Sequence, residues 1–100
     1  MKIAIVSKNP PGGRCTLYGI YAKTIADRLG ALVETVFPAS DAAVQPPALT
    51  IDGRVIVPSD GLILSPQDIR DGLGPDGSPE LLERLEEAET RFMDACEASS

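Results

Sequence analysis

PPALTIDGRVIV, residues 46–57, is the stretch that decides the predicted fold. Two short runs rich in β-branched residues, 48–51 and 54–57, flank the pair Asp52-Gly53. An Asp-Gly pair between such runs is the strongest short-range hairpin signal, because a type I′ turn requires two residues with positive φ. We therefore expect an antiparallel pair of strands here.

Upstream of this hairpin the pattern is strand, helix, strand. Residues 2–7 form a short, largely apolar run that is typical of a central strand buried on both faces. Helical periodicity follows over 16–29 and ends at Gly30, where a left-handed residue is expected, and 31–37 reads as a second strand. A helix between two strands implies a right-handed parallel crossover.

Two helices are predicted downstream of the hairpin. Ser65 and Pro66 carry the N-cap and first-turn signals of a helix that ends near 72–74. After the Pro/Gly-rich segment 74–79, a last helix over 79–97 carries a heptad stripe of Leu81, Leu85, Ala88, Phe92 and Ala95. The order β-α-β-β-β-α, with an added C-terminal helix, predicts an α/β fold with a four-stranded mixed sheet.

Composition and charge restrict the function classes. Hydrophobic residues make up 43% and charged residues 24% of the chain, which is ordinary globular composition. Residues 1–74 are electrically balanced, so the net charge of −6 lies in 75–100, and we expect neither nucleic acid nor an anionic membrane as a partner. No apolar run is long enough to span a bilayer, and the start is a poor signal peptide, so we expect a cytoplasmic protein.

The ionisable and nucleophilic side chains of the sequence limit the reactions that the protein could catalyse. Histidine is absent, which removes imidazole bases and histidine metal ligands. The two cysteines, Cys15 and Cys96, are too far apart in sequence to match a metal-ligand spacing, so we expect no metal site. Chemistry must use thiol, hydroxyl, carboxylate or backbone groups, or a cofactor.

A cysteine heading the helix of a βαβ unit, followed by proline, strand, turn, strand and helix, resembles the thioredoxin-like superfamily. The run 46–69 is similar to the second half of small glutaredoxin-like redox proteins. The resemblance covers residues 1 to about 73 and implies a thioredoxin-like domain over 1–74 with an acidic helical extension over 75–100. It also implies that Cys15 is the nucleophile and that Pro47 is a cis-proline beside it.

Two residues depart from the pattern of that superfamily. Tyr18 stands where a second cysteine is expected, so a dithiol cycle within the motif is impossible. Pro46 precedes the expected cis-proline and has no N–H to offer a substrate strand. The resemblance therefore implies a single-cysteine thiol/disulfide protein, an oxidoreductase or electron-transfer protein that acts on protein thiols, protein disulfides or glutathione and needs no bound cofactor.

The position of Cys15 itself favours a reactive thiol. Unsatisfied N–H groups and the positive dipole end of the helix lower a thiol pKa, and Arg14 acts in the same direction. Thr16, Tyr18 and Pro46 are expected neighbours of the site. The alternative interpretation is that Cys15 is a small, half-buried apolar residue. Because Tyr18 and Tyr21 lie one turn apart, we expect that they are not both buried on the same stripe of the helix.

Other interpretations stay open. Cys96 is either an incidental thiol or the thiol that resolves an adduct of Cys15, which requires the last helix to fold back across the active face. The acidic helix either docks on its own domain or contacts a partner or a second copy, in which case the protein is a non-catalytic adaptor. A third possibility is a flavodoxin-like flavin or nucleotide site formed by Ser7, Gly12, Gly13 and Thr16.

Overall fold

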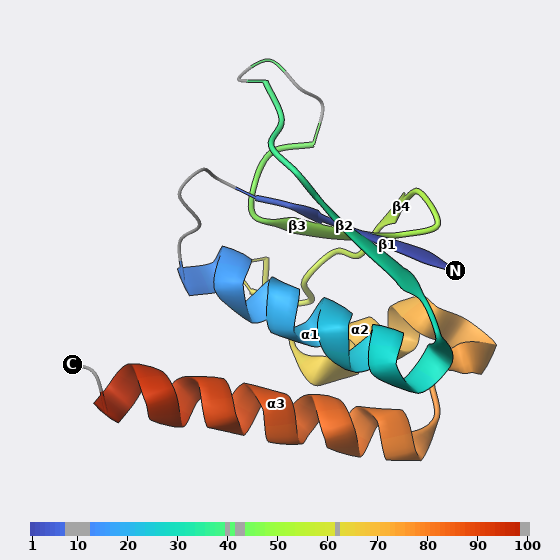
Figure 1. Ribbon diagram of the computed structural model, residues 1–100, viewed down its shortest axis with the longest axis vertical. Coiled ribbons are helices and arrows are strands. Elements are labelled where there is room, and N and C mark those ends of the chain that lie inside the picture. Colours follow the sequence, from blue (N-terminus) through green and yellow to red (C-terminus); the bar gives the residue numbers. More distant parts are fainter. Residues whose placement is uncertain (8–12, 40, 42–43, 62, 99–100) are drawn as a thin grey trace.

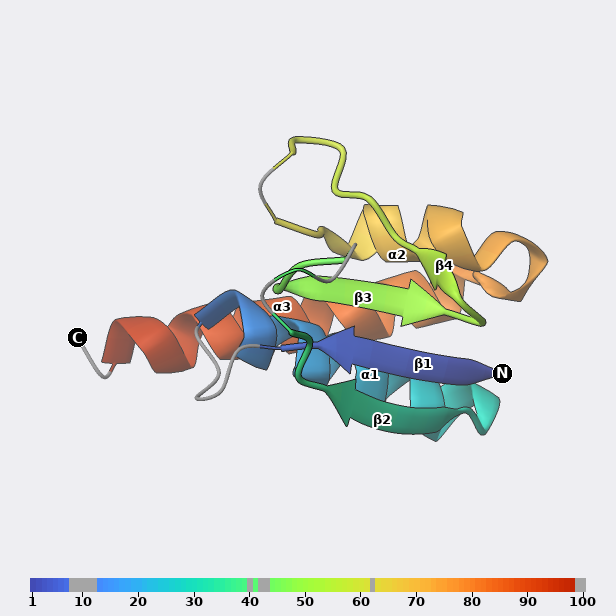
Figure 2. The same ribbon diagram turned by 90° about the horizontal axis from the view of Figure 1, so that it is seen from above.

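A four-stranded mixed sheet forms one layer of the fold. The structure is a computed structural model that describes residues 1–7, 13–39, 41, 44–61 and 63–98. The strands are β1 (Lys2–Val6), β2 (Leu32–Val36), β3 (Ala48–Ile51) and β4 (Arg54–Val55), in the spatial order β2-β1-β3-β4 (Figure 2). β1 pairs in parallel with β2 and antiparallel with β3, and β3 pairs antiparallel with β4. The expected parallel crossover and antiparallel hairpin are both confirmed.

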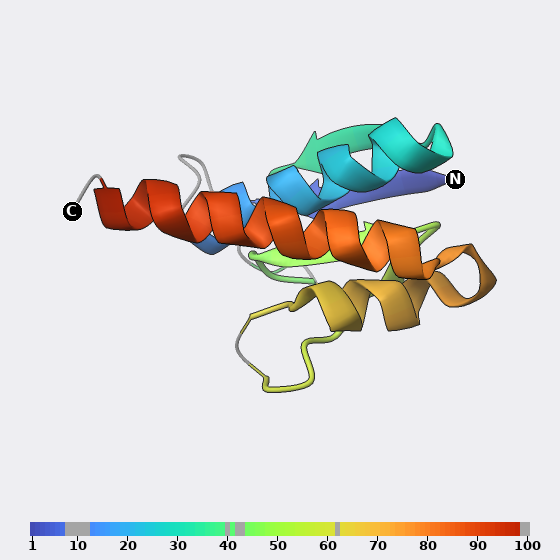
Figure 3. The same cartoon turned by 90° about the horizontal axis from the view of Figure 1, so that it is seen from below.

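The helices of the described chain all lie on one face of this sheet (Figure 1). They are α1 (Gly13–Leu29), α2 (Pro66–Leu73) and α3 (Pro79–Ala98), with a short 3₁₀ turn (Gly74–Asp76) between the last two. Helix α3 packs on the outer side of α1 and α2 (Figure 3). Within the described residues, none of these helices is both long and apolar enough to cross a membrane.

The core therefore lies between the sheet and the helices. Ile3 and Ile5 of β1 are buried on the helix side, whereas Lys2 is exposed and Ala4 half-buried on the opposite face. On this uncovered face, Lys2 Nζ lies 3.2 Å from Glu34 Oε1 of β2. β1 is an interior strand as predicted. Its second face is buried at Val6, at 6% exposure, but not at Lys2 and Ala4, so the expectation of burial on both faces is wrong for those two residues, because no helix covers them in the described part of the chain.

The turn and the helix cap that the local sequence predicts are both present in the structure. Asp52 and Gly53 both have positive φ, 50° and 84°, as a type I′ turn requires. Ser65 caps α2 in a reciprocal capping box with Asp68. β4 is shorter than expected and ends at Val55. The N–H of Ile56 still donates to the Leu49 carbonyl oxygen at 2.9 Å, and Pro58 has no N–H to extend the pairing further.

The acidic helix α3 is part of the core. Leu81 and Leu85 from its heptad stripe are buried, at 2% and 0% exposure, and Phe92 packs against the core at its edge. Figure 3 shows α3 lying along α1 and α2. The interpretation that the acidic helix docks on its own domain is therefore confirmed.

Candidate functional site

Cys15 lies in the first turn of α1, which begins at Gly13. Cys15 is a free thiol and is only 5% exposed, whereas the preceding residue, Arg14, is exposed. The first turn of a helix presents N–H groups without helical partners and the positive end of the dipole, so this position favours an anion. Burial has the opposite effect, because it disfavours a charged thiolate.

Tyr18 follows Cys15 by one helical turn and is 2% exposed. Its hydroxyl oxygen accepts a hydrogen bond from the backbone N–H of Leu64 at 3.0 Å. Burial raises the pKa of Tyr18, while the Leu64 hydrogen bond and the charge of Arg14 partly offset that rise. Asp60 and Cys15 are also near enough for their charges to raise this pKa, so Tyr18 is a neutral phenol beside the thiol.

Tyr21 completes a tyrosine pair on α1. Its ring stacks on that of Tyr18 with the centroids 6.5 Å apart. Its hydroxyl lies 3.2 Å from the Leu64 carbonyl oxygen and 3.2 Å from Glu89 Oε2 of α3, so its single proton serves one acceptor at a time. Burial raises the pKa of Tyr21, and the adjacent Glu89 carboxylate raises it further.

Both tyrosines of this pair are buried and their rings stack on each other, so the expectation that they would not both be buried on the same stripe is wrong. The physical reason is that α1 is covered on more than one side. The segment around Leu64 covers one side of the helix and α3 covers another. The backbone N–H and C=O of Leu64 are held by the two hydroxyl groups, which fixes the approach of the chain to α2.

Pro47 lies at the same end of the sheet. It precedes β3, whose first residue, Ala48, pairs with Val6 at the end of β1, and the Pro46–Pro47 peptide bond is cis. A groove of about 350 Å³ opens here. Its walls are formed by Tyr18, Val44, Gln45, Pro47, Ala48, Val55, Ile56, Val57 and Pro58. Tyr18 thus lies both beside Cys15 and in the wall of the groove that contains Pro47.

Cys96 lies in a different groove. Together with Thr16 it lines a hollow of about 680 Å³ between α1 and α3. Consecutive helical residues point about 100° apart, so Thr16 faces α3 while Cys15 faces the side of Tyr18. The structure therefore brings Cys96 beside Thr16 and not to the side of α1 on which Cys15 is buried.

The remaining expectations concern metals and phosphate. No group of three or more possible metal ligands occurs among the described residues. Ser7 is buried at the end of β1, and Gly13 and Thr16 are exposed at the start of α1. Gly12, and with it most of the loop of the flavodoxin-like alternative, lies outside the described residues.

Sequence reasoning missed the polar contacts that hold the loop before α2. Asp68 accepts hydrogen bonds from the backbone N–H groups of Ser65 at 3.0 Å and Ser59 at 3.2 Å. Burial of Asp68 opposes ionisation, but these hydrogen bonds prevail and lower the pKa of its carboxyl group. The capping-box spacing of Ser65 and Asp68 was a signal for the first contact, whereas the contacts of Tyr21 with Glu89 and Leu64 had no signal in sequence.

The protein is a small α/β protein with a buried thiol at a helix N-terminus. A tyrosine pair lies next to this thiol, and one of the tyrosines lines the groove that contains Pro47. Comparisons with protein-family models, with curated proteins and with solved structures found no match in any of the three.

Proposed function

We propose that the protein is a single-cysteine thiol/disulfide redox protein of thioredoxin-like fold, with Cys15 as its nucleophile. The order β2-β1-β3-β4, with β1 and β2 parallel and β3 antiparallel, supports the fold part of this proposal. One observation carries the function: Tyr18 links the buried Cys15 to the groove beside Pro47. A disulfide held in that groove would contact Tyr18, the wall residue that lies one helical turn after Cys15.

The proposed reaction needs only an external thiol as co-reactant. The Cys15 thiolate attacks one sulfur of a substrate disulfide, a mixed disulfide forms, and the other sulfur leaves as a thiolate that takes up a proton. A second thiolate, from glutathione or a protein thiol, then attacks the substrate sulfur of the mixed disulfide and releases Cys15. These two steps are a net thiol–disulfide exchange, which leaves the first substrate sulfur in a disulfide with the external thiol. Because Tyr18 replaces a second cysteine, full reduction of the substrate requires a second external thiol to attack that disulfide.

The groove beside Pro47 favours an extended substrate segment. Its walls combine apolar side chains, such as Val55 and Val57, with the amide of Gln45. Val57 is 72% exposed, so an apolar substrate side chain would cover surface that now faces water. Pro46 has no N–H, so hydrogen bonding from the segment would have to use its carbonyl oxygen.

The test is the rate of Cys15 alkylation against pH in a Cys96→Ser variant. We expect a midpoint below the ordinary thiol value of about 8.5, because the helix N-terminus and Arg14 stabilise the thiolate. Arg14→Gln in the same background should raise the midpoint, and Arg54→Gln, remote on β4, is the matched control. A Cys15 thiol that titrates at or above 8.5 in the parent variant would refute the redox proposal.

A second candidate is a thioredoxin-like adaptor without thiol chemistry, and the 5% exposure of Cys15 favours it. In that case Cys15 is a small core residue, and the acidic outer face of α3 contacts the partner. A Cys15→Ala variant separates the two candidates. An adaptor keeps its partner binding with the variant, whereas a redox protein loses every mixed disulfide that the wild type forms with glutathione disulfide.

A further inference from the structure

The groove between α1 and α3 has an apolar half. Ile20 from α1 and Ala88, Phe92 and Ala95 from α3 line it, and Cys96 lies at its end. Its volume of about 680 Å³ lies within the range of small-molecule sites in proteins. The apolar surface between Ala88 and Cys96 extends along about 12 Å of helix, at 1.5 Å per residue.

The other half of the groove is cationic. A second hollow of about 380 Å³ adjoins the first and shares Thr24, Asp27, Ala88 and Arg91 with it. Lys23, Arg28, Arg84 and Arg91 line the combined groove, which is four of the nine Lys and Arg residues of an acidic protein. This concentration of positive charge is opposite to the net charge of −6.

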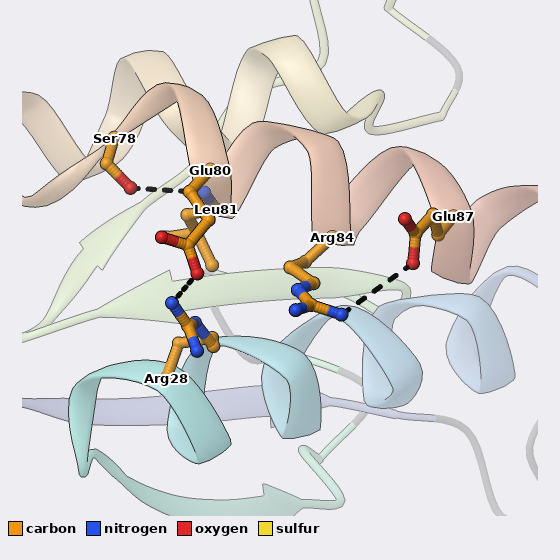
Figure 4. Close-up of polar contacts among 6 residues, drawn as sticks. All are labelled: Arg28, Ser78, Glu80, Leu81, Arg84 and Glu87. Carbon is orange, nitrogen blue, oxygen red and sulfur yellow. Dashed lines mark hydrogen bonds and ion pairs between the residues drawn. The ribbon is translucent and has the colours of Figure 1, made fainter.

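Four cations and two carboxylates, Asp27 and Glu87, line the combined groove, and Arg91 also borders a hollow lined by Glu83, Glu86 and Glu87. Arg28 pairs with Glu80, and Figure 4 shows this contact between α1 and α3. Glu87 Oε2 is shared by Arg84 Nη1 at 4.0 Å and Arg91 Nη2 at 3.6 Å, so one carboxylate faces two guanidinium groups. Lys23 and Asp27, which also line the groove, balance each other.

From this arrangement we propose that the α1–α3 groove binds a free amphiphile with one anionic head group and a medium-length apolar chain. The chain lies on Ile20, Ala88 and Phe92 and points toward Cys96. The head group lies beside Glu87 and accepts hydrogen bonds from the N–H groups of Arg84 and Arg91 that Glu87 leaves available. A monocarboxylate with an alkyl chain has both properties, so the class of ligand is a fatty-acid-like carboxylate. This site is separate from Cys15 and the Pro47 groove, and the proposal is independent of the redox function.

Cys96 provides a built-in reporter for the test, because it is an exposed thiol at the apolar end of the groove. Alkylation of Cys96 in the full chain is followed by peptide mass spectrometry, which separates it from Cys15. We expect saturating decanoate, below its micellar concentration, to slow Cys96 alkylation at least fivefold, and decanol at the same concentration to change it less than twofold. Equal protection by both probes, or none by decanoate, overturns the proposal.

Charge variants test the placement of the head group. The double variant Arg84→Gln/Arg91→Gln should weaken decanoate binding about tenfold, because each exposed charge contact is worth up to about 1 kcal/mol. Its matched control, Lys2→Gln/Arg54→Gln, removes the same charge from the sheet and should leave binding within twofold. Equal weakening by both variants would overturn the proposal. Protection of Cys96 that grows with protein concentration in the absence of decanoate would also overturn it, because a second copy would then fill the groove.

Discussion

Replacement of Leu85 by alanine tests whether α3 is part of the cooperative fold. Leu85 is fully buried, in the core cluster that α1, α2 and the sheet share. Truncation of such a leucine costs 2–5 kcal/mol through lost transfer free energy and the cavity left behind, and we expect about 3 kcal/mol here. A domain of this size has about 5–15 kcal/mol of stability, so the change is a large fraction of the total.

The assay is urea unfolding followed by far-ultraviolet circular dichroism and by tyrosine fluorescence, which reports on Tyr18 and Tyr21. Met93→Ala is the matched control, because Met93 is on the same helix, is 46% exposed and has a similar helix propensity to leucine. We expect the control to cost less than about 1 kcal/mol. If Leu85→Ala costs no more than the control, or if helix signal is lost before tyrosine signal, then α3 is an extension and not part of the core.

Three further predictions follow from particular contacts. Tyr21→Phe should cost about 1–2 kcal/mol in urea unfolding, because the buried Leu64 carbonyl loses a donor; a loss below about 0.3 kcal/mol would contradict this. Gly53→Ala should cost about 1 kcal/mol by the same measurement, because alanine is strained at φ 84°, and Gly13→Ala in α1 is the control, which should not destabilise. Asp68 has a lowered folded-state pKa, so its stabilisation is present above the unfolded value of about 3.9 and is lost as pH falls through the folded value. Asp68→Asn should therefore be less stable than wild type at pH 7 and lose less stability between pH 5 and pH 2, and parallel pH profiles would refute the assignment.

The features that sequence could predict are those determined by residues close together in the chain. Asp52-Gly53, Ser65 and Gly30 each specify a backbone conformation locally, and all three have the predicted role. The heptad stripe predicted the buried residues Leu81 and Leu85 of α3, because side-chain period depends only on helix geometry, but Ala95 at the end of the stripe is exposed. These signals together were sufficient for the element order and the mixed sheet.

The features that sequence missed depend on how distant elements dock. The uncovered face of the sheet follows from the 37–47 connection, which contains no helix among its described residues. Burial of both Tyr18 and Tyr21 requires the segment around Leu64 and α3 to cover α1 together. The same is true of the α1–α3 groove, whose cations are dispersed in sequence and meet only because α3 runs back along α1.

The residues that hold Tyr18 in place bear on how a substrate would reach Cys15, the proposed nucleophile. In the proposed reaction we expect the start of α1 and Arg14 to favour a thiolate at Cys15 and the burial of Cys15, at 5% exposure, to disfavour it. A disulfide in the Pro47 groove contacts Tyr18 first, and Tyr18 is held by Leu64, whose carbonyl is held by Tyr21. Since Tyr21 also reaches Glu89, any change in the docking of α3 would alter the support of the tyrosine that stands between the groove and the thiol.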